Sequence, residues 1–329
     1  MVDGVSAIMP AYNAERFIAE AIESILNQTF KDFEFIIVDD GSSDNTWEVI
    51  NMYARRDTRI RPFRQENRGI SEAMNRGIQE ARNDWIARLD ADDIALPHRL
   101  ERQLMAARTN PKVAAWGAYA YHINEKGRIL SLSTPGPTSE EEFFNFLQQG
   151  NPVYVISTTA FMQKRFVLEV RGYDPRFDCT EDLELFDRLA DLGPILAIPE
   201  PLVRVRIHSG SITMQRFSKM RMFTRYIRAR RRAKAAGVQP PSWEEFIQEY
   251  QSRSIFIRLR RCVDDISQYF YRRFGVSIAN GRYVRAAAYF AFSAILKPRY
   301  TLLRAWNQRF STAARKHLSS AESLGSEFR

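Results

Sequence analysis

Apolar positions in the first 110 residues follow two alternating patterns. Short continuous apolar runs, typical of strands buried on both faces, lie at 5–9, 33–38 and 85–89. The segments between them repeat their apolar residues every three or four positions, as amphipathic helices do. The helices expected on this basis are 14–26, 47–56, 71–82 and 97–108. The alternation predicts an α/β fold whose mostly parallel, Rossmann-like sheet has flanking helices.

Local signals refine these elements. Asn13 is expected to cap the first helix, and Pro97 is expected in the first turn of the fourth. The later elements expected are a hairpin turn at 124–127, helices near 139–149 and 182–192, and a strand pair near 195–206.

Charge divides the chain into two regions. Residues 1–213 hold 24 Lys and Arg against 32 Asp and Glu, whereas residues 214–329 hold 24 against 7. The second region is basic, aromatic and helical in pattern, with breaks at "VQPPS" (238–242) and at Pro298. We therefore predict an α/β domain at 1–213 and a mainly helical region at 214–329, with different roles.

Three further features bear on the expected cellular compartment. No apolar run approaches the ~18–20 residues of a spanning helix, and the first residues lack the basic stretch of a signal peptide. Cys179 and Cys262 are the only cysteines, which argues against a disulfide framework. We expect a cytoplasmic protein, with peripheral attachment to the inner face of the membrane as an open alternative.

Polar clusters directly follow the three apolar runs. They are "PAYN" (10–13), "DDGSSDN" (39–45) and "DADD" (90–93). Ligands of open α/β sheets bind beyond the carboxyl ends of the strands. The sequence therefore predicts one crevice that all three clusters line.

The third cluster suggests a metal site. Asp90 and Asp92 are two positions apart, so in an extended segment their carboxylates point the same way. Together they could hold a hard divalent cation that keeps open positions for phosphate. The alternative is a solvated turn with an acidic helix cap. Asp93 is expected to point elsewhere and support the turn.

Other candidates lie at neighbouring positions. Asp39 and Asp40 follow the second strand; one can accept hydrogen bonds from a nucleobase or ribose while the other caps the turn. Tyr12 offers a flat face for stacking a base, although a surface aromatic would look the same.

Two more candidates come later in the chain. Glu181 and Asp182 begin an amphipathic helix, where a carboxylate stays ionised and could serve as a base. Plain helix capping is the alternative. His208 lies in a polar loop after a strand and could bind metal, or could be a surface histidine.

Several enzyme classes lack support. Neither a G-x-x-x-x-G-K-[ST] loop nor a G-x-G-x-x-G fingerprint occurs, which argues against P-loop NTPases and dinucleotide oxidoreductases. A nucleotidyltransferase also uses paired aspartates, but it would favour a glycine-rich, lysine-bearing loop where this chain has "PAYNAERF".

The order of the motifs resembles glycosyltransferase family 2, with its GT-A fold. The matching segments are "SAIMPAYNAERFIAEAIESILNQTFKDFEFIIVDDGSSDNT", "ENRGISEAMNRGI", "ARLDADDIALPHRLERQ", "TEDLELFDRL" and "RIHSGSIT". They cover residues 5–213, so the resemblance makes this region the nucleotide-sugar-binding catalytic domain. It implies inverting transfer from a nucleotide-diphosphate sugar, expected to be UDP-linked, with Mg²⁺ or Mn²⁺ as cofactor.

The resemblance also implies roles for donor-binding residues. By position, Pro10 and Tyr12 border the nucleobase, Asp40 reads it, and Asn67 lies in the donor pocket.

The remaining implied roles concern metal and catalysis. Asp90 approaches ribose and sugar and lies beside the metal, which Asp92 holds on the diphosphate. Asp182 is the base that deprotonates the acceptor hydroxyl, with Glu181 beside it. His208 closes over the diphosphate or metal.

The chain departs from the family pattern at Met74, where many relatives carry arginine, and at Val205, where tyrosine is common. The Q-x-x-R-W motif of processive synthases is also absent. We therefore expect one sugar per binding event, added to a hydroxyl of a cell-surface glycan or lipid-linked saccharide precursor, as in envelope polysaccharide biosynthesis.

The basic helical region leaves alternatives open. It could attach to an anionic membrane surface, or form a subdomain packed on the catalytic domain with solvated arginines. No nucleic-acid recognition motif accompanies the charge, so nucleic acid is not an expected partner. The alternative to an enzyme is an inactive GT-A-like binding module that acts through these helices.

Overall fold

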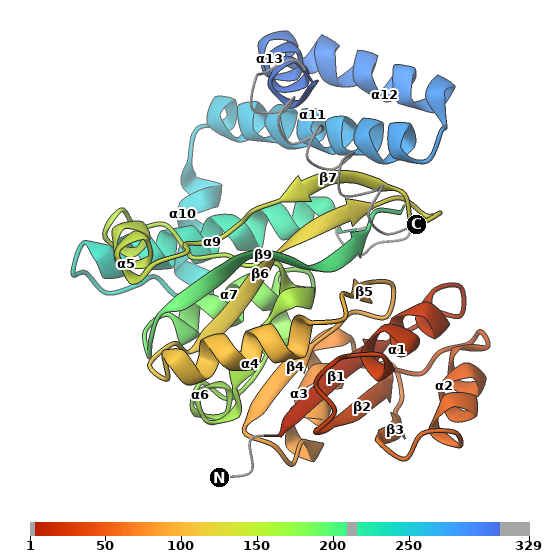
Figure 1. Ribbon diagram of the computed structural model, residues 1–329. Coiled ribbons are helices and arrows are strands. Elements are labelled where there is room, and N and C mark those ends of the chain that lie inside the picture. Colours follow the sequence, from red (N-terminus) through yellow and green to blue (C-terminus); the bar gives the residue numbers. More distant parts are fainter. Residues whose placement is uncertain (1–3, 209–215, 310–329) are drawn as a thin grey trace. The chain divides into compact units, whose positions relative to one another are not determined.

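The computed structural model describes residues 4–208 and 216–309 (Figure 1). Contacts within the chain divide these residues into two compact units. The first unit holds the described residues up to Ala120, together with Ser133–Val205 and Arg230–Val238. The second holds Tyr121–Leu132, the described part of Arg206–Ala229, and the described residues from Gln239 onward. The domain boundary predicted between residues 213 and 214 lies outside the described residues and stays a prediction.

The described strands form one nine-stranded sheet in the order β3-β2-β1-β4-β8-β6-β9-β5, with β7 paired to β6. Their bounds are β1 Val5–Ala11, β2 Phe33–Asp39, β3 Ile60–Arg64, β4 Trp85–Arg88, β5 Ile94–Ala95, β6 Ala115–Ile123, β7 Ile129–Ser133, β8 Phe161–Gln163 and β9 Ile195–Arg206. The strands β3, β2, β1 and β4 run parallel, whereas β8 is antiparallel to β4 and β6, and β5 to β9.

Helices flank this sheet, and further helices follow it in the chain (Figure 1). Their bounds are α1 Ile18–Leu26, α2 Thr46–Ala54, α3 Ile70–Glu80, α4 Arg99–Thr109, α5 Glu140–Gln148, α6 Lys164–Glu169, α7 Glu181–Leu189, α9 Phe217–Ala235, α10 Trp243–Ser252, α11 Ile255–Ala279, α12 Tyr283–Leu296 and α13 Pro298–Arg309. Two short 3₁₀ helices, η1 Ser157–Thr159 and η2 Pro175–Phe177, complete the described elements. The predicted α/β fold with a helical C-terminal region is confirmed.

Strand β1 lies between β2 and β4, and all seven of its residues are buried. This burial explains its continuous apolar run, because helices cover both faces of a sheet of this class. Helix α3 packs especially closely on β1. A Cβ added to Gly77 would lie 2.5 Å from Cγ2 of Ile8, so a larger residue would push the helix off the strand.

The register places three strand ends side by side. Val5 of β1 pairs with Phe33 of β2 and Trp85 of β4, so the three strands start level and run in parallel. The N–H of Leu89 donates to the carbonyl of Ile8, which continues the pairing just past β4. The three polar clusters therefore follow strand ends at one edge of the sheet, while the crevice that they are predicted to line stays a prediction.

Three local predictions are wrong. Helix α1 begins at Ile18 rather than at Asn13, which has a positive φ of 47° and caps no helix. Pro97 precedes α4 instead of lying in its first turn, because the helix begins at Arg99. The strand pair expected near 195–206 is a single strand, β9.

Other local predictions are confirmed. The chain turns at 124–127, where the N–H of Gly127 donates to the carbonyl of Asn124, and β7 pairs with β6. Pro298 is the first residue of α13 and separates it from α12, as expected of a residue that cannot continue a helix. Across the described ranges, no helix combines the length and apolarity needed to cross a membrane.

Candidate active site

The loops after β1 and β2 are joined by hydrogen bonds. The N–H of Asn13 donates to Oγ of Ser42 (2.9 Å), and the N–H of Ser43 donates to Oδ1 of Asn13 (2.9 Å). The N–H of Ala14 donates to Oγ1 of Thr46 at the start of α2 (2.7 Å). The left-handed backbone of Asn13 makes this reciprocal pairing possible, and short polar side chains tolerate that conformation.

Asp40 organises the segment that precedes α3. Its carboxylate is buried and accepts hydrogen bonds from Nε2 of Gln65 (2.8 Å), the N–H of Arg68 (3.0 Å) and the N–H of Gly69 (2.8 Å). Three donors on one carboxylate fix the path of the chain from β3 to α3. The predicted role of Asp40 in reading a nucleobase stays a prediction.

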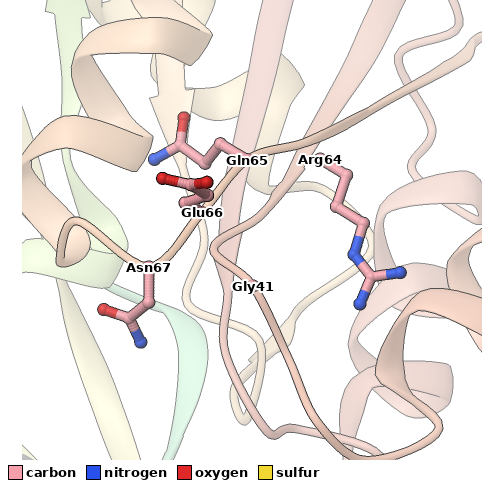
Figure 2. Close-up of a pocket in the computed structure, with 5 residues that line it drawn as sticks. All are labelled: Gly41, Arg64, Gln65, Glu66 and Asn67. Atoms are coloured by element: carbon pink, nitrogen blue, oxygen red, sulfur yellow. The ribbon is translucent and has the colours of Figure 1, made fainter.

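An open pocket of about 560 Å³ lies beside this segment. Its lining residues are Gly41, Arg64, Gln65, Glu66 and Asn67 (Figure 2). Gly41 has a φ of +75°, and a Cβ there would lie 2.8 Å from the backbone nitrogen of Asn67. The two loops that form the pocket can therefore approach this closely only with glycine at that position.

The donor-side candidates at the end of β1 differ in exposure. Pro10 is buried in β1 opposite Val38, while Tyr12 directly follows the strand and is 52% exposed. An exposed ring beside the joined loops has a face available for a planar ligand. Tyr12, Asp40 and Asn67 thus lie on loops of one unit, and their donor-binding roles stay predictions.

A buried arginine at the end of β4 connects two of the predicted clusters. The Nε of Arg88 lies 2.8 Å from Oδ1 of Asp90, and its Nη2 lies 3.0 Å from Oε1 of Glu181. Asp90 and Glu181 are far apart in the sequence, yet one guanidinium holds both. The "DADD" turn and the start of α7 therefore belong to one site.

The carboxyl groups at the start of α7 are shifted toward their neutral forms. Burial raises the pKa of Glu181 to about 7, although the charge of Arg88 opposes the shift. Burial also raises the pKa of Asp182, and Arg88 again opposes it. A carboxylate with a raised pKa accepts a proton more readily, so this pair is suited to general base chemistry.

Sequence reasoning missed Arg88 and Tyr173. Arg88 interrupts the apolar run "WIARL", and a charged residue inside a buried strand signals a paired or functional group. Its guanidinium carbon lies 5.7 Å from the ring centroid of Tyr173, whose burial raises the pKa of the phenol to about 12. Asn75 of α3 holds the backbone of Tyr173 through two hydrogen bonds of 2.8 Å.

Helix α7 is anchored by arginines of α9. Asp187, fully buried, accepts from Nη2 of Arg230 (2.6 Å) and Nε of Arg231 (2.7 Å). Arg230 also reaches Oε1 of Glu184 (3.0 Å). Glu184 and Asp187 lie two and five positions beyond Asp182, so these pairs fix the helix that carries it. Sequence reasoning interpreted the α9 arginines as solvated or membrane-facing; Arg231 is neither, since it is buried.

Asp90 and Asp92 are the predicted metal ligands at the end of β4, where few protein groups would coordinate the ion. Asp90 and Asp92 are both half-buried at the end of β4. Within the described part of the chain, no three His, Cys, Asp or Glu side chains are grouped so that they could hold a metal ion by themselves. Mg²⁺ is commonly held by one or two carboxylates with substrate phosphates completing its coordination, so Asp92 could serve with a donor diphosphate although Arg88 binds Asp90. His208 follows β9 in the second unit, so its metal role stays a prediction.

Two comparisons of solved structures support the fold. The chain superposes on S. aureus TarS 1–349 in complex with UDP-GlcNAc with a TM-score of 0.54, at 13% identity, covering 90% of this chain and 91% of that one. It also superposes on the mannosyltransferase PcManGT from Pyrobaculum calidifontis, solved with GDP-Man and Mn²⁺, with a TM-score of 0.53 at 17% identity, covering 97% and 79%. At these identities the likeness concerns the fold alone.

Sequence comparisons settle the family. An uncharacterized glycosyltransferase of Methanocaldococcus jannaschii is 33% identical over 226 residues, which cover 68% of this chain and 77% of the relative. The model of glycosyl transferase family 2 matches residues 6–172, which include the first three polar clusters, Arg88 and Asn75. The chain therefore belongs to glycosyl transferase family 2.

Proposed function

We propose that the protein transfers a single sugar, with inversion, from a nucleotide-diphosphate sugar to a hydroxyl of a cell-surface glycan or lipid-linked saccharide precursor. That it is a glycosyltransferase using a nucleotide-sugar donor follows from the family. The stereochemistry, the metal and the acceptor are the proposed parts. The single observation that carries the proposal is the guanidinium of Arg88, which ties the donor-side Asp90 to the start of α7.

Asp182 is the proposed general base. The acceptor oxygen attacks the anomeric carbon while the bond from that carbon to the diphosphate oxygen breaks, and Asp182 takes the hydroxyl proton. Attack from the face opposite the leaving group inverts the anomeric centre. The raised pKa of Asp182 strengthens it as a base, and its N-terminal place on an anchored helix fixes its direction.

The donor is proposed to bind across the three strand ends. Tyr12 and Pro10 border the base, Asp40 reads it, and Asn67 lines the adjacent pocket. UDP and GDP donors are both candidates, because TarS was solved with UDP-GlcNAc and PcManGT with GDP-Man.

Asp92 is the proposed ligand of Mg²⁺ or Mn²⁺, with His208 and Asp90 as further candidates. Because Arg88 holds Asp90, we assign Asp90 chiefly to orienting ribose and sugar. The cation would neutralise charge that develops on the diphosphate leaving group. PcManGT, whose fold is similar, was solved with Mn²⁺.

A donor panel tests this function. Purified protein is incubated with UDP- and GDP-sugars, with and without Mn²⁺, and nucleoside diphosphate release is measured. We expect Mn²⁺-dependent release from at least one donor. Asp92→Ala should lose metal-dependent donor binding in calorimetry, while the control Asp84→Ala, at the exposed opposite end of β4, should keep it. Silence across the panel, or unchanged binding in Asp92→Ala, would contradict the proposal.

A further inference from the structure

The helices α11, α12 and α13 of the second unit have small or hydroxyl-bearing side chains in their interior. The buried ones are Ser267, Tyr271, Ser277, Ala286, Ser293 and Thr301. Ser293 donates from Oγ to the carbonyl of Ser267 (3.0 Å), and its Oγ also lies 2.8 Å from Oγ1 of Thr301. Aromatic pairs complete the contact between α11 and α12, with ring centroids 5.2 Å apart for Phe270 and Phe292 and 5.1 Å apart for Phe274 and Phe290.

Large apolar side chains of the same helices lie outside. On α12, Val284 is 86% exposed and Ile295 is 77% exposed. Val284, Ala288, Phe292 and Ile295 are all exposed, and their spacing of four, four and three positions puts them on one face of the helix. The exposed large apolar residues of the three helices are Ile255, Phe256, Ile257, Leu259, Ile266, Ile278, Tyr283, Val284, Phe292, Ile295, Leu302, Leu303 and Trp306. We call this set the α11–α13 surface.

Positive charge predominates in the helices that carry the α11–α13 surface. Residues 255–306 hold ten Lys and Arg but only two acidic residues, Asp264 and Asp265. Asp265 is bound by Arg221 (2.9 Å), and Asp264 is paired with Lys297. Two copies of this surface would repel each other. A lipid bilayer with anionic headgroups would attract the positive charge of the α11–α13 surface, and its acyl chains would bury the exposed apolar side chains.

We propose that the α11–α13 surface binds anionic phospholipid bilayers. The apolar side chains enter the boundary between headgroups and acyl chains, while arginine side chains extend to the lipid phosphates. Trp306 and Tyr283 are residue types that favour this boundary. The helices lie on the membrane, since none in the described ranges could cross it. This membrane contact goes beyond the proposed function and does not depend on it.

Vesicle flotation of the full chain tests the proposal. We expect flotation with vesicles that contain phosphatidylglycerol, and much less with pure phosphatidylcholine. The double variant Val284→Asp/Ile295→Asp should lower partitioning at least about tenfold. Met105→Asp/Leu168→Asp is the matched control, because it places the same two charges on exposed apolar positions of α4 and α6 in the first unit, and it should float normally. Arg285→Gln/Arg299→Gln should weaken the preference for anionic lipid and the dependence on salt, because two of the ten positive charges are removed.

Three outcomes would overturn the proposal. One is no flotation at low salt; another is equal flotation of wild type and Val284→Asp/Ile295→Asp. The third is a solution dimer that this variant dissociates while no protein binds vesicles, which would identify a second copy as the occupant. Circular dichroism checks that the variant is folded. Its nucleoside diphosphate release from soluble donor should match wild type, so failure of this proposal and of the proposed function can be told apart.

Discussion

The replacement Glu181→Gln isolates the energetic cost of the buried carboxyl beside Arg88. Glu181 has an ordinary pKa of 4.5, which burial raises to about 7. The folded state therefore holds the proton more tightly than the unfolded state does. The contribution of Glu181 to the free energy of unfolding is fully present below pH 4.5 and is lost as the pH rises through 7. The reason is that the folded protein must then bury an ionised carboxylate whose desolvation Arg88 only partly offsets.

The magnitude follows from the shift. At 1.36 kcal/mol per pKa unit, a rise from 4.5 to about 7 corresponds to roughly 3 kcal/mol, of which most is lost between pH 5 and pH 8. Glutamine has the shape of the neutral acid, can still accept from Arg88, and cannot ionise. The free energy of unfolding of Glu181→Gln, relative to wild type, should thus rise by about 2–3 kcal/mol from pH 5 to pH 8.

Urea unfolding followed by circular dichroism at a series of pH values measures this difference. Glu141→Gln, at an exposed position of α5, is the matched control and should show no such rise. The reasoning is refuted if the difference between Glu181→Gln and wild type is independent of pH, or if the variant loses relative stability as pH rises.

Three further substitutions test other parts of the site. Asp40→Asn should lower stability by about 1–3 kcal/mol and weaken donor binding in calorimetry. The reason is that an amide NH₂ would replace one of the two carboxylate oxygens that accept from the N–H groups of Arg68 and Gly69. Unchanged binding would count against the role of Asp40. Arg231→Met should destabilise by about 3–5 kcal/mol in thermal unfolding, since it leaves Asp187 buried with fewer partners; a small effect would show that Arg230 alone suffices. Tyr173→Phe should change stability by less than about 1 kcal/mol in thermal unfolding, because removal of a buried hydroxyl offsets the loss of its contact with Arg88; a loss of several kcal/mol would contradict this balance.

Much of the first unit could be predicted from the sequence because its determinants are local. The continuous apolar runs of the first 110 residues specify strands, and the amphipathic segments between them specify helices. Because the strands are parallel, the polar residues that follow them come to one edge of the sheet. The positions of Asp40 and Asp90 followed from that rule. The prediction for Asn13 is wrong because its side-chain Oδ1 accepts a hydrogen bond from the N–H of Ser43 in another loop, not from the first turn of a helix.

The parts that escaped prediction depend on contacts between distant segments. Arg88 pairs with Glu181 across 93 positions, and nothing near Arg88 in the sequence names that partner. Arg230 and Arg231 look like part of a solvated basic stretch until α9 is placed against Asp187. Local patterns specify the period and the charge of a helix, but its neighbours decide which of its faces is buried.

Asp182 is proposed to remove the acceptor proton in a family 2 sugar transfer. The rate of nucleoside diphosphate release from saturating donor, compared between wild type and Asp182→Asn, measures this role. Loss of a general base costs about 10²–10⁴-fold in rate. We expect a fall in this range with donor affinity preserved, because Asp182 lies on α7 rather than on the proposed donor-binding loops. Wild-type release by Asp182→Asn would contradict it.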